Sequence, residues 1–341
     1  MTKKCKIRYG IPAAVCIIAI IGSFYAFFLS PLSAHEATQY VYIDEDDDID
    51  SVAAKLSPIA KRHSLEGFTT MARHSHYPEY IRTGRYAIEP GERVMTVFRH
   101  LRNGIQTPMR LTVPSVRTVS RMAKELGNKL MADSASFEKA LTDATVCQEL
   151  GFDTATVMAM FIPNSYDIYW NISTDNLLKR LKKEYDNFWD STRKAKANAL
   201  SLSPIEVSIL ASIVDEETAN DGEKPTIAGL YYNRLQQGML LQADPTVKYA
   251  LQQFSLKRIY NSMLNTDNPY NTYRYKGLPP GPIRNPSVAG IDAVLNMQRH
   301  NYLYMCAKED FSGTHNFAAT LAEHQQNARR YVQALNERNI K

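Results

Sequence analysis

The longest apolar stretch of the chain lies near its N-terminus and predicts a membrane-spanning helix. Ile11 to Leu29 is a run of 19 residues without a charge, and as a helix it measures roughly 28 Å, close to the apolar thickness of a bilayer. Four basic residues precede the run, and no Lys or Arg follows it until Lys55. This asymmetry predicts a cytoplasmic N-terminus and an exported body. We therefore expect a tail over residues 1–8 and an uncleaved anchor over residues 9–31, with a cleaved signal peptide as the alternative.

Hydrophobic periodicity after the anchor predicts short strands mixed with helices. Strict alternation of apolar residues is typical of half-buried strands, whereas a spacing of three to four is typical of helices. The strands are expected at 39–43, 84–88 and 109–113, and the helices at 49–56, 94–101, 115–126, 134–141 and 173–199. Ser115 and Ser134 are candidate N-caps of two of these helices. This mixture predicts an α+β fold after the transmembrane helix.

One part of the expected α+β region over residues 38–155 has a familiar order of elements. Residues 84–114 read as a strand, a Pro-Gly turn, a helix and a strand, and this order resembles a LysM-like module, a unit that binds sugars. The acidic run at 44–48 lacks the Gly and Glu of an EF-hand loop. We therefore interpret these acids as residues that precede a helix N-terminus rather than as a cation site. The aromatic-rich segment 161–170 offers faces for sugar rings, but we favour a place in the core.

A helix with unusually clear start signals is expected after residue 202. Ser203 can cap it, Pro204 occupies the first helical position, and Glu206 completes a capping box. On a helical wheel, Ser208 and Ser212 fall on the side that we expect to face solvent.

The end of this helix carries three consecutive acids that the wheel separates. With Leu210 at the centre of the apolar stripe and a step of about 100° per residue, Glu217 falls inside the stripe. Asp215 and Glu216 fall outside it. Partial burial disfavours the charged form of a carboxyl group and raises its pKa, as a general acid near neutral pH requires. A structural ion pair at a frayed helix end is the alternative for Glu217.

Segments further along the chain could line a cleft. The loops 268–273 and 277–286 are dense in Pro and Gly, which fixes a backbone before a ligand arrives. Tyr270, Asn271 and Tyr273 offer the aromatic and amide groups that sugars use. Asp244 precedes Pro245 at an expected helix start, and we interpret it as a cap of that helix.

Composition and charge exclude several classes of protein. Hydrophobic residues make up 44% and charged residues 22% of the 341 residues, which excludes wholesale disorder. Residues 1–34 supply +4 of the formal net charge of +5, so a large nucleic-acid-binding face is not indicated. Four Cys are too few for a disulfide scaffold, and no spacing suggests a metal site. Whether Cys147 and Cys306 pair is left open.

Six ordered segments in the second half of the chain resemble the YceG-like, or MltG, family of endolytic murein transglycosylases. They lie at 209–218, 232–235, 238–247, 270–273, 277–283 and 315–317, within an expected catalytic domain over residues 160–341. The resemblance implies cleavage of the β-1,4 bond between N-acetylmuramic acid and N-acetylglucosamine in nascent peptidoglycan. The product end would be a 1,6-anhydro-muramyl residue, and Glu217 aligns with the family's catalytic Glu.

The resemblance also has implications for cofactors, partners, location and substrate-binding residues. No cofactor or metal is expected, and the partners are glycan strands, the cytoplasmic membrane and, as candidates, peptidoglycan synthases, but no nucleic acid. The catalytic domain would lie on the exterior or periplasmic side of a single-pass anchor. The expected substrate-binding residues are Thr218, Asn233, Gln242, Asp244, Tyr270, Asn271, Tyr273 and His315.

This chain departs from the family at one place. The family usually has Glu-Lys-Glu-Thr where residues 215–218 are Asp-Glu-Glu-Thr, which argues against a catalytic role for Asp215 and leaves Glu217 in place. Two alternatives remain. A hydrolase on the same scaffold needs a second carboxylate roughly 5–9 Å from Glu217. A non-catalytic, membrane-tethered glycan-binding protein would not need Glu217 at all.

Overall fold

The computed structural model describes residues 3–256 and 258–338, so the first two residues of the expected tail lie outside it. Helix α1 (Lys3–Phe24) continues into a π-helical turn, η1 (Tyr25–Leu29). Within the described residues, Pro12–Leu29 is the straight helical segment that is long and apolar enough to cross a membrane. Its apolar side chains are exposed as far as Tyr25, as Ile18 at 69% illustrates, and the last four residues are partly buried. This agrees with the predicted anchor, although the helix begins before the apolar run.

The chain forms two compact units, which are described separately. Unit 1 comprises residues 1–111 and 167–172, and unit 2 comprises residues 112–166 and 173–341. The sequence had suggested a division between residues 155 and 160. The structure assigns 112–155 to unit 2 because helices of this segment pack on one another and on a helix after residue 173. Both units mix helices with short strands, which confirms the α+β class.

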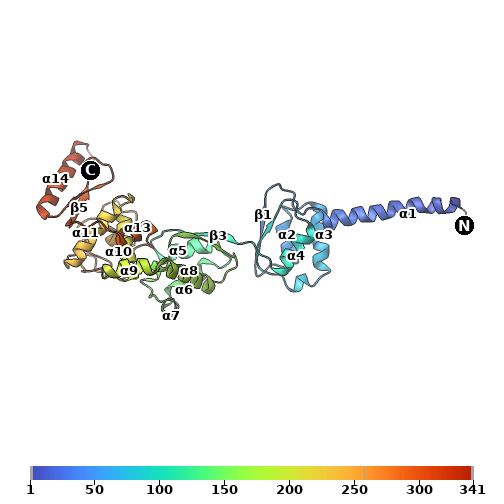
Figure 1. The fold of residues 1–341 in the computed structure, drawn as a ribbon, viewed down its shortest axis with the longest axis horizontal. Coiled ribbons are helices and arrows are strands. Elements are labelled where there is room, and N and C mark those ends of the chain that lie inside the picture. The colour runs from blue at the N-terminus through green and yellow to red at the C-terminus, as the bar shows by residue number, and fades with distance from the viewer. Residues whose placement is uncertain (1–2, 257, 339–341) are drawn as a thin grey trace. The chain divides into compact units, whose positions relative to one another are not determined.

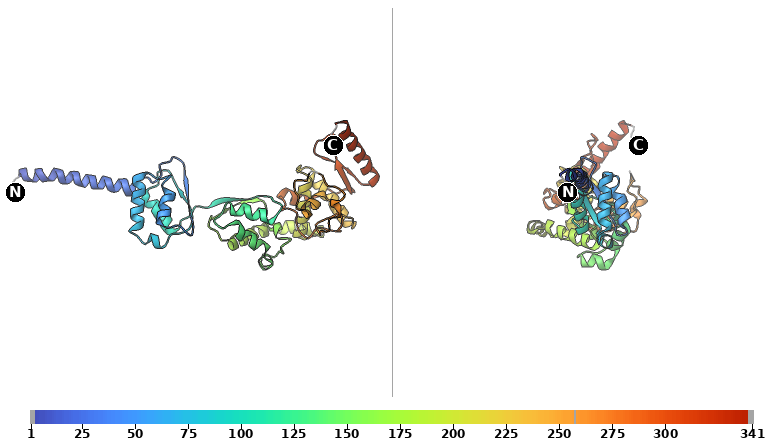
Figure 2. Two further views of the ribbon diagram at one scale, coloured as in Figure 1. Left: turned by 180° about the vertical axis from the view of Figure 1, so that it is seen from behind. Right: turned by 90° about the vertical axis from the view of Figure 1, so that its right-hand side faces the viewer.

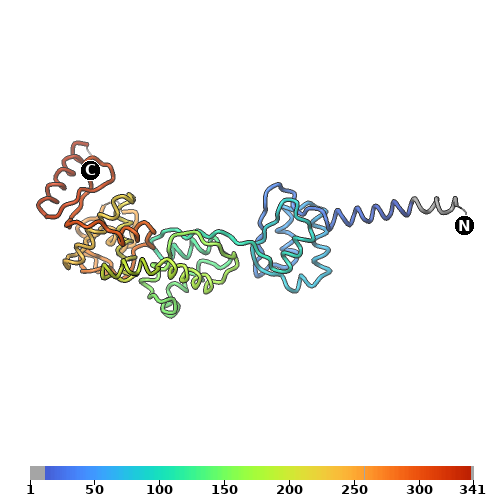
Figure 3. The backbone as a smooth tube through the Cα atoms, viewed as in Figure 1, coloured from blue at the N-terminus to red at the C-terminus, as the bar shows by residue number. Residues whose placement is uncertain are grey.

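Unit 1 is built on an antiparallel pair of strands covered by helices (Figures 1 and 3). After η1 its elements are β1 (Gln39–Ile43), α2 (Ile49–Leu56), α3 (Arg62–Arg73), η2 (Tyr77–Glu79), β2 (Gly84–Ile88) and α4 (Val94–Asn103). In the register, Gln39 faces Ile88 and Ile43 faces Gly84. Every second residue of β2 is buried against the helices, so the predicted alternation is confirmed.

The LysM-like grouping of residues 84–114 is not confirmed. Its three elements exist, with β3 at Met109–Val113, but β2 pairs with β1 and β3 pairs with β4 (Asn164–Ile168). Tyr86 and Ile88 of β2 are buried in a core shared with Val41 and Ile43 of β1. Strand partners far apart in the sequence decide this pairing, and periodicity alone cannot identify them.

The acidic run before α2 serves the helix, as predicted. Asp48 accepts a hydrogen bond of 2.8 Å from the backbone N–H of Ser51 and caps the helix. The Lys55 ammonium donates to Asp44 at 2.7 Å and also to Asp47. The aromatic segment divides: Phe161 is fully buried, whereas Tyr169 is 51% exposed.

Unit 2 contains the remaining helices and a C-terminal hairpin. Its elements after β3 are α5 (Val119–Gly127), α6 (Ser134–Thr142), α7 (Ala144–Glu149), η3 (Val157–Met160), β4, α8 (Thr174–Phe188), α9 (Ser191–Ala199), α10 (Pro204–Glu217), α11 (Lys224–Gln236), α12 (Asp244–Ala250), η4 (Met263–Asn265), α13 (Val288–Leu295), β5 (Tyr304–Ala307), β6 (His315–Ala318) and α14 (Leu321–Glu337). Strands β5 and β6 are antiparallel, and α14 packs on them (Figure 2).

In unit 2, two predicted helix boundaries and one predicted cap were wrong. Helix α5 starts at Val119 with Thr118 as its cap, because the Ser115 hydroxyl instead donates to the Asn285 carbonyl. Helix α6 is capped by Asp133 rather than by Ser134. The single helix expected over 173–199 is two helices, α8 and α9, separated at the buried Trp189 and at Asp190, the cap of α9.

Candidate active site

The site is organised by α10, and its start is as the sequence predicts. Ser203 caps the helix and Glu206 completes the capping box. The predicted solvent-facing side does not exist, because Ser208 and Ser212 are both fully buried. The Ser208 hydroxyl donates to the Pro204 carbonyl at 2.9 Å, and that of Ser212 donates to the Ile209 carbonyl at 2.7 Å. Short hydroxyl groups can thus satisfy themselves on the helix backbone, so serine did not mark an exposed face.

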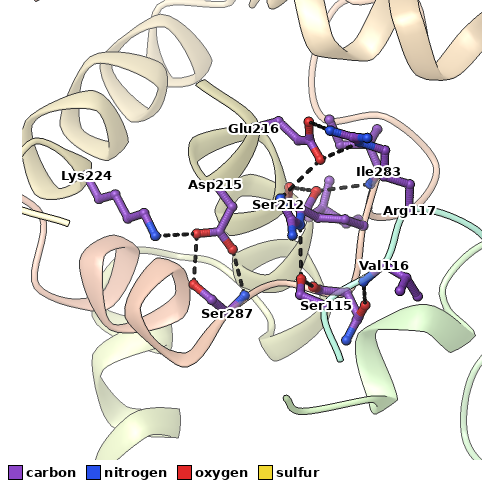
Figure 4. Close-up of polar contacts among 12 residues, drawn as sticks. Ser115, Val116, Arg117, Ser212, Asp215, Glu216, Lys224, Ile283 and Ser287 are labelled. Atoms are coloured by element: carbon purple, nitrogen blue, oxygen red, sulfur yellow. Dashed lines mark hydrogen bonds and ion pairs between the residues drawn. The ribbon is translucent and has the colours of Figure 1, made fainter. Parts of the chain in front are cut away.

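The first two acids at the end of α10 point in different directions and are held by cations (Figure 4). Asp215 lies 2.8 Å from the Lys224 ammonium and accepts 2.6 Å and 2.8 Å hydrogen bonds from the backbone and hydroxyl of Ser287. Glu216 accepts two hydrogen bonds from the Arg117 guanidinium, at 2.8 Å and 2.9 Å. Both side chains are almost buried, and their carboxylates are occupied by these contacts. Asp215 and Glu216 therefore hold the structure together.

Glu217 differs from its two neighbours because no cation pairs with it among the residues that the structure describes. It is partly buried, and the Tyr231 hydroxyl donates a 2.6 Å hydrogen bond to its Oε1. Desolvation raises the pKa of Glu217 to about 7, and the charge on Asp244 contributes in the same direction. The Tyr231 hydrogen bond and the Lys248 ammonium oppose this rise in pKa. A carboxyl group of this kind can both give and take a proton near neutral pH.

Glu217 opens into a cleft of about 230 Å³ within unit 2. The cleft is formed by the end of α10, one face of α11, the start of α12 and strand β5 with the beginning of β6. Its lining residues are Glu217, Leu230, Tyr231, Arg234, Leu241, Gln242, Asp244, Tyr273, Leu303, Met305, Cys306, Ala307 and His315. The structure thus brings the expected Glu217, Gln242, Asp244, Tyr273 and His315 together.

Asp244 faces this cleft and does not cap α12. The capping position is occupied by Ala243, and the Asp244 carboxylate instead accepts a 2.6 Å hydrogen bond from the Tyr273 hydroxyl. The capping interpretation was wrong because Tyr273, 29 residues away, competes for the carboxylate. Gln242 enters the cleft from a left-handed backbone position with φ of 53°, and its Oε1 accepts a 3.3 Å hydrogen bond from Arg234.

Two of the expected substrate-binding amides lie outside the cleft lining and hold loops in place. Asn233 donates through Nδ2 to the carbonyls of His300 at 2.8 Å and Tyr302 at 3.1 Å. Asn271 is fully buried, and its Nδ2 donates to two carbonyls of the preceding loop, at 2.9 Å and 2.8 Å. Their amide groups donate to backbone carbonyls, so the prediction that they bind sugar is not supported.

Tyr270 and Thr218 also have structural contacts. The ring of Tyr270 packs against that of Tyr249 with 4.7 Å between centroids, away from the cleft lining. Thr218 follows the last residue of α10, is buried, and donates through its hydroxyl to Glu223 at 3.3 Å. Neither residue lines the cleft, and a direct contact of either with substrate is not supported.

His315 is held in the cleft by a carboxylate. Its backbone N–H donates to Glu223 Oε1 at 2.6 Å, and its Nδ1 lies 3.1 Å from Glu223 Oε2. When Nδ1 carries the proton in this contact, Nε2 is left as an acceptor. The arrangement orients the imidazole to accept a hydrogen bond from a hydroxyl group.

Sequence reasoning missed Tyr231 and Arg234. Arg234 is buried and donates to the carbonyls of Leu303 at 2.6 Å and Leu241 at 2.8 Å, which ties two cleft walls to α11. The available signal was spacing: Ile227, Tyr231 and Arg234 follow the i, i+4, i+7 pattern of one helix face.

Among the residues that the structure describes, the Cys, His and acidic side chains do not gather into a metal site. Within residues 3–256 and 258–338, no group of three or more His, Cys, Asp or Glu is placed to hold a metal ion. Cys147 and Cys306, whose pairing the sequence left open, are both free thiols.

Comparisons with known proteins agree with the resemblance noted in the sequence. An endolytic murein transglycosylase of Bacillus subtilis is 34% identical over 166 residues, which cover 49% of this chain and 45% of that protein. One of Streptococcus pneumoniae is 25% identical over 350 residues, which cover 90% of this chain and 62% of that protein. The chain therefore spans less than two thirds of the length of either relative.

A solved structure and a family model extend this agreement. The crystal structure of a yceG-like protein from Listeria monocytogenes superposes with a TM-score of 0.56 at 24% identity, covering 86% of this chain and 99% of that one. This similarity concerns the fold. The model of the YceG-like family matches residues 41–330. Because this match covers most of both units, the chain belongs to the YceG-like family.

Proposed function

We propose that this protein is a membrane-anchored endolytic lytic transglycosylase that cleaves the β-1,4 bond between N-acetylmuramic acid and N-acetylglucosamine in nascent peptidoglycan. The observation that carries the proposal is Glu217, a carboxyl group in a cleft, without a cation partner among the described residues and with its pKa raised to about 7. The names of the two relatives support the choice of substrate and reaction.

The chemistry needs one carboxyl group. Glu217 donates its proton to the glycosidic oxygen as the bond to C1 of the muramyl residue breaks. The C6 hydroxyl of the same sugar then closes on C1, and the Glu217 carboxylate takes the hydroxyl proton. The product is a 1,6-anhydro end, and water is not consumed. Because Tyr231 donates to Oε1, Oε2 is the oxygen that carries the transferable proton.

The remaining cleft residues hold the sugar and stabilise developing charge. The negative charge of the Asp244 carboxylate stabilises the positive charge of an oxocarbenium-like transition state. Its hydrogen bond from Tyr273 keeps it directed into the cleft. Gln242 and His315 offer an amide and an imidazole to sugar hydroxyls. The apolar helix α1 would keep this unit at the outer face of the cytoplasmic membrane, near peptidoglycan synthases.

A muramidase-type hydrolase is the second candidate, and Asp244 is the observation that favours it. This second carboxylate lines the same cleft as Glu217 and acts electrostatically on it. In a hydrolase, Asp244 would activate water or attack C1, and the product would be a reducing end.

The test is digestion of purified peptidoglycan by the full-length protein in detergent, followed by mass spectrometry of the fragments. We expect anhydro ends from the wild type and at least a 1,000-fold lower rate from Glu217→Gln, roughly the loss seen when an essential catalytic group is removed. Glu138→Gln, an exposed change on α6, is the matched control and should cleave normally. Normal cleavage by Glu217→Gln would exclude Glu217 as the acid of either enzymatic mechanism. No cleavage by the wild type, together with full biological activity of Glu217→Gln in cells, would favour a glycan-binding scaffold.

A further inference from the structure

A second, smaller cavity adjoins the Glu217 cleft. It measures about 50 Å³ and is lined by Arg117, Glu216, Pro245, Lys248, Tyr249, Phe254 and Ile283. At the end of α10, Glu216 lines this cavity and Glu217 lines the cleft. At the start of α12, Pro245 lines the cavity and Asp244 lines the cleft. Two pairs of consecutive residues therefore form the wall between the cavity and the cleft.

The small cavity carries more positive than negative charge. Glu216 is shared by two guanidinium groups, that of Arg117 at 2.8 Å and that of Arg284 at 3.2 Å. Lys248 adds a third cation, and its ammonium forms no ion pair of 4.0 Å or less with any residue that the structure describes. Asp244 lies one turn earlier on α12, but its carboxylate is directed to Tyr273 and the cleft.

The other wall of the cavity is aromatic. Phe254 lies 6.1 Å from Tyr249 between ring centroids, and the Arg117 guanidinium sits 5.3 Å from the centre of the Phe254 ring. The volume is too small for a sugar ring, but it accommodates a carboxylate with a short aliphatic neighbour. A partly buried ammonium beside such a surface is suited to a small anionic group with an apolar flank.

We propose that this cavity binds a carboxylate of the peptide substituent on the muramyl residue whose glycosidic bond lies at Glu217, with Lys248 Nζ as the donor. The inference rests on the proposed function, because that function places a muramyl residue at Glu217. The muramyl sugar bears a lactyl-linked peptide with carboxylates, whereas N-acetylglucosamine bears no charge. The cavity would thereby let the protein distinguish peptide-bearing strands from strands without peptides.

The first test measures binding without cleavage. The probes are N-acetylmuramyl dipeptide with a free terminal carboxylate and the same compound with a carboxamide there. Neither probe contains the bond to be cut. We expect the full-length wild type to bind the carboxylate about tenfold more tightly, which corresponds to one charge-assisted hydrogen bond. Lys248→Met should lose this difference, Lys248→Arg should keep it, and Lys183→Met, an exposed change on α8, should not alter it.

Two binding results would overturn the carboxylate site. One is equal or undetectable binding of the two probes by the wild type. The other is a Lys248→Met variant that still prefers the carboxylate.

The second test separates failure of the site from failure of the proposed function. Cleavage of peptide-bearing strands is compared with cleavage of strands stripped by an amidase, at pH 5.5, where Glu217 is protonated with or without Lys248. We expect Lys248→Met to raise the half-saturating concentration of peptide-bearing strands alone. If the half-saturating concentrations of both kinds of strand rise equally, the proposed site is wrong. If the wild type cleaves neither strand but discriminates between the probes, the proposed function fails and the carboxylate site stands.

Discussion

The Tyr231 hydroxyl donates a 2.6 Å hydrogen bond to Oε1 of Glu217, across the contact between α11 and α10. It holds one carboxyl oxygen in position and stabilises the ionised form. The pKa of Glu217 nevertheless rises to about 7, because desolvation outweighs this hydrogen bond. Glu217 therefore remains available as an acid at neutral pH. A single substitution nearby can raise or lower its pKa.

Tyr231→Phe removes a contact that lowers the pKa of Glu217, so that pKa should rise. The wild-type rate should fall about tenfold per pH unit above about pH 7 as the acid ionises. In Tyr231→Phe this fall should begin at higher pH, with a rate about tenfold lower at pH 6 because Oε1 is no longer held. The neighbouring Tyr232→Phe is the control, since its hydroxyl donates to the Leu200 carbonyl. An unchanged pH profile in Tyr231→Phe would contradict this role.

Asp244→Asn should move the same pH profile in the opposite direction. The Asp244 charge raises the pKa of Glu217, so its removal should lower that pKa and start the loss of activity below pH 7. The amide oxygen can still accept the Tyr273 hydrogen bond, so the local structure should persist. A transglycosylase variant should still produce anhydro ends. The maximal rate should fall as well, because the charge that stabilises the oxocarbenium-like transition state is lost. Reducing ends from the wild type that disappear in Asp244→Asn would instead favour the hydrolase, in which Asp244 activates water or attacks C1.

Glu223→Gln should affect the binding of substrate more than its cleavage. The isosteric amide can still accept the backbone hydrogen bond of His315, but it no longer attracts the imidazole proton with a negative charge. We expect the half-saturating concentration of glycan strands to rise about three- to tenfold with a smaller change in maximal rate, since one oriented hydrogen bond is weakened. The reverse pattern, a lower maximal rate with unchanged saturation, would show that His315 takes part in proton transfer.

Asp215→Ala should destabilise the fold without moving the pH profile of the molecules that remain folded. Both partners in the Asp215–Lys224 pair are almost buried, with 4% and 8% of their side chains exposed. Removing one partner of a buried pair costs about 3–5 kcal/mol of unfolding free energy. Asp221→Ala is the matched control, because Asp221 contacts the same ammonium at 2.7 Å but is 71% exposed, and it should cost less than about 1 kcal/mol. Equal losses in thermal denaturation would contradict this account.

Local signals in the sequence predicted several elements well. Strands β1 and β2 and the capped start of α10 lie where periodicity and capping residues place them. The helical wheel was less successful, because α10 is enclosed on all sides: Asp215 and Glu216, which the wheel places outside the apolar stripe, have only 4% and 11% of their side chains exposed.

The errors came from contacts between residues far apart in the sequence. Ser212 can be buried because its hydroxyl accepts a hydrogen bond from the backbone N–H of Ile283, 71 residues away. Asp244 accepts a hydrogen bond from Tyr273 instead of capping α12, and the Asn271 amide donates to a carbonyl of the preceding loop. Such competition between local and distant partners is decided by the packed fold.

The source of the oxygen at the cleaved muramyl C1 tests the central claim most directly. Glycan strands are digested in water enriched in heavy oxygen, and the new muramyl ends are analysed by mass spectrometry beside those from Glu217→Gln. The account predicts anhydro ends without heavy oxygen from the wild type and almost no new ends from the variant. Reducing ends that carry heavy oxygen, or normal cleavage by the variant, would contradict it.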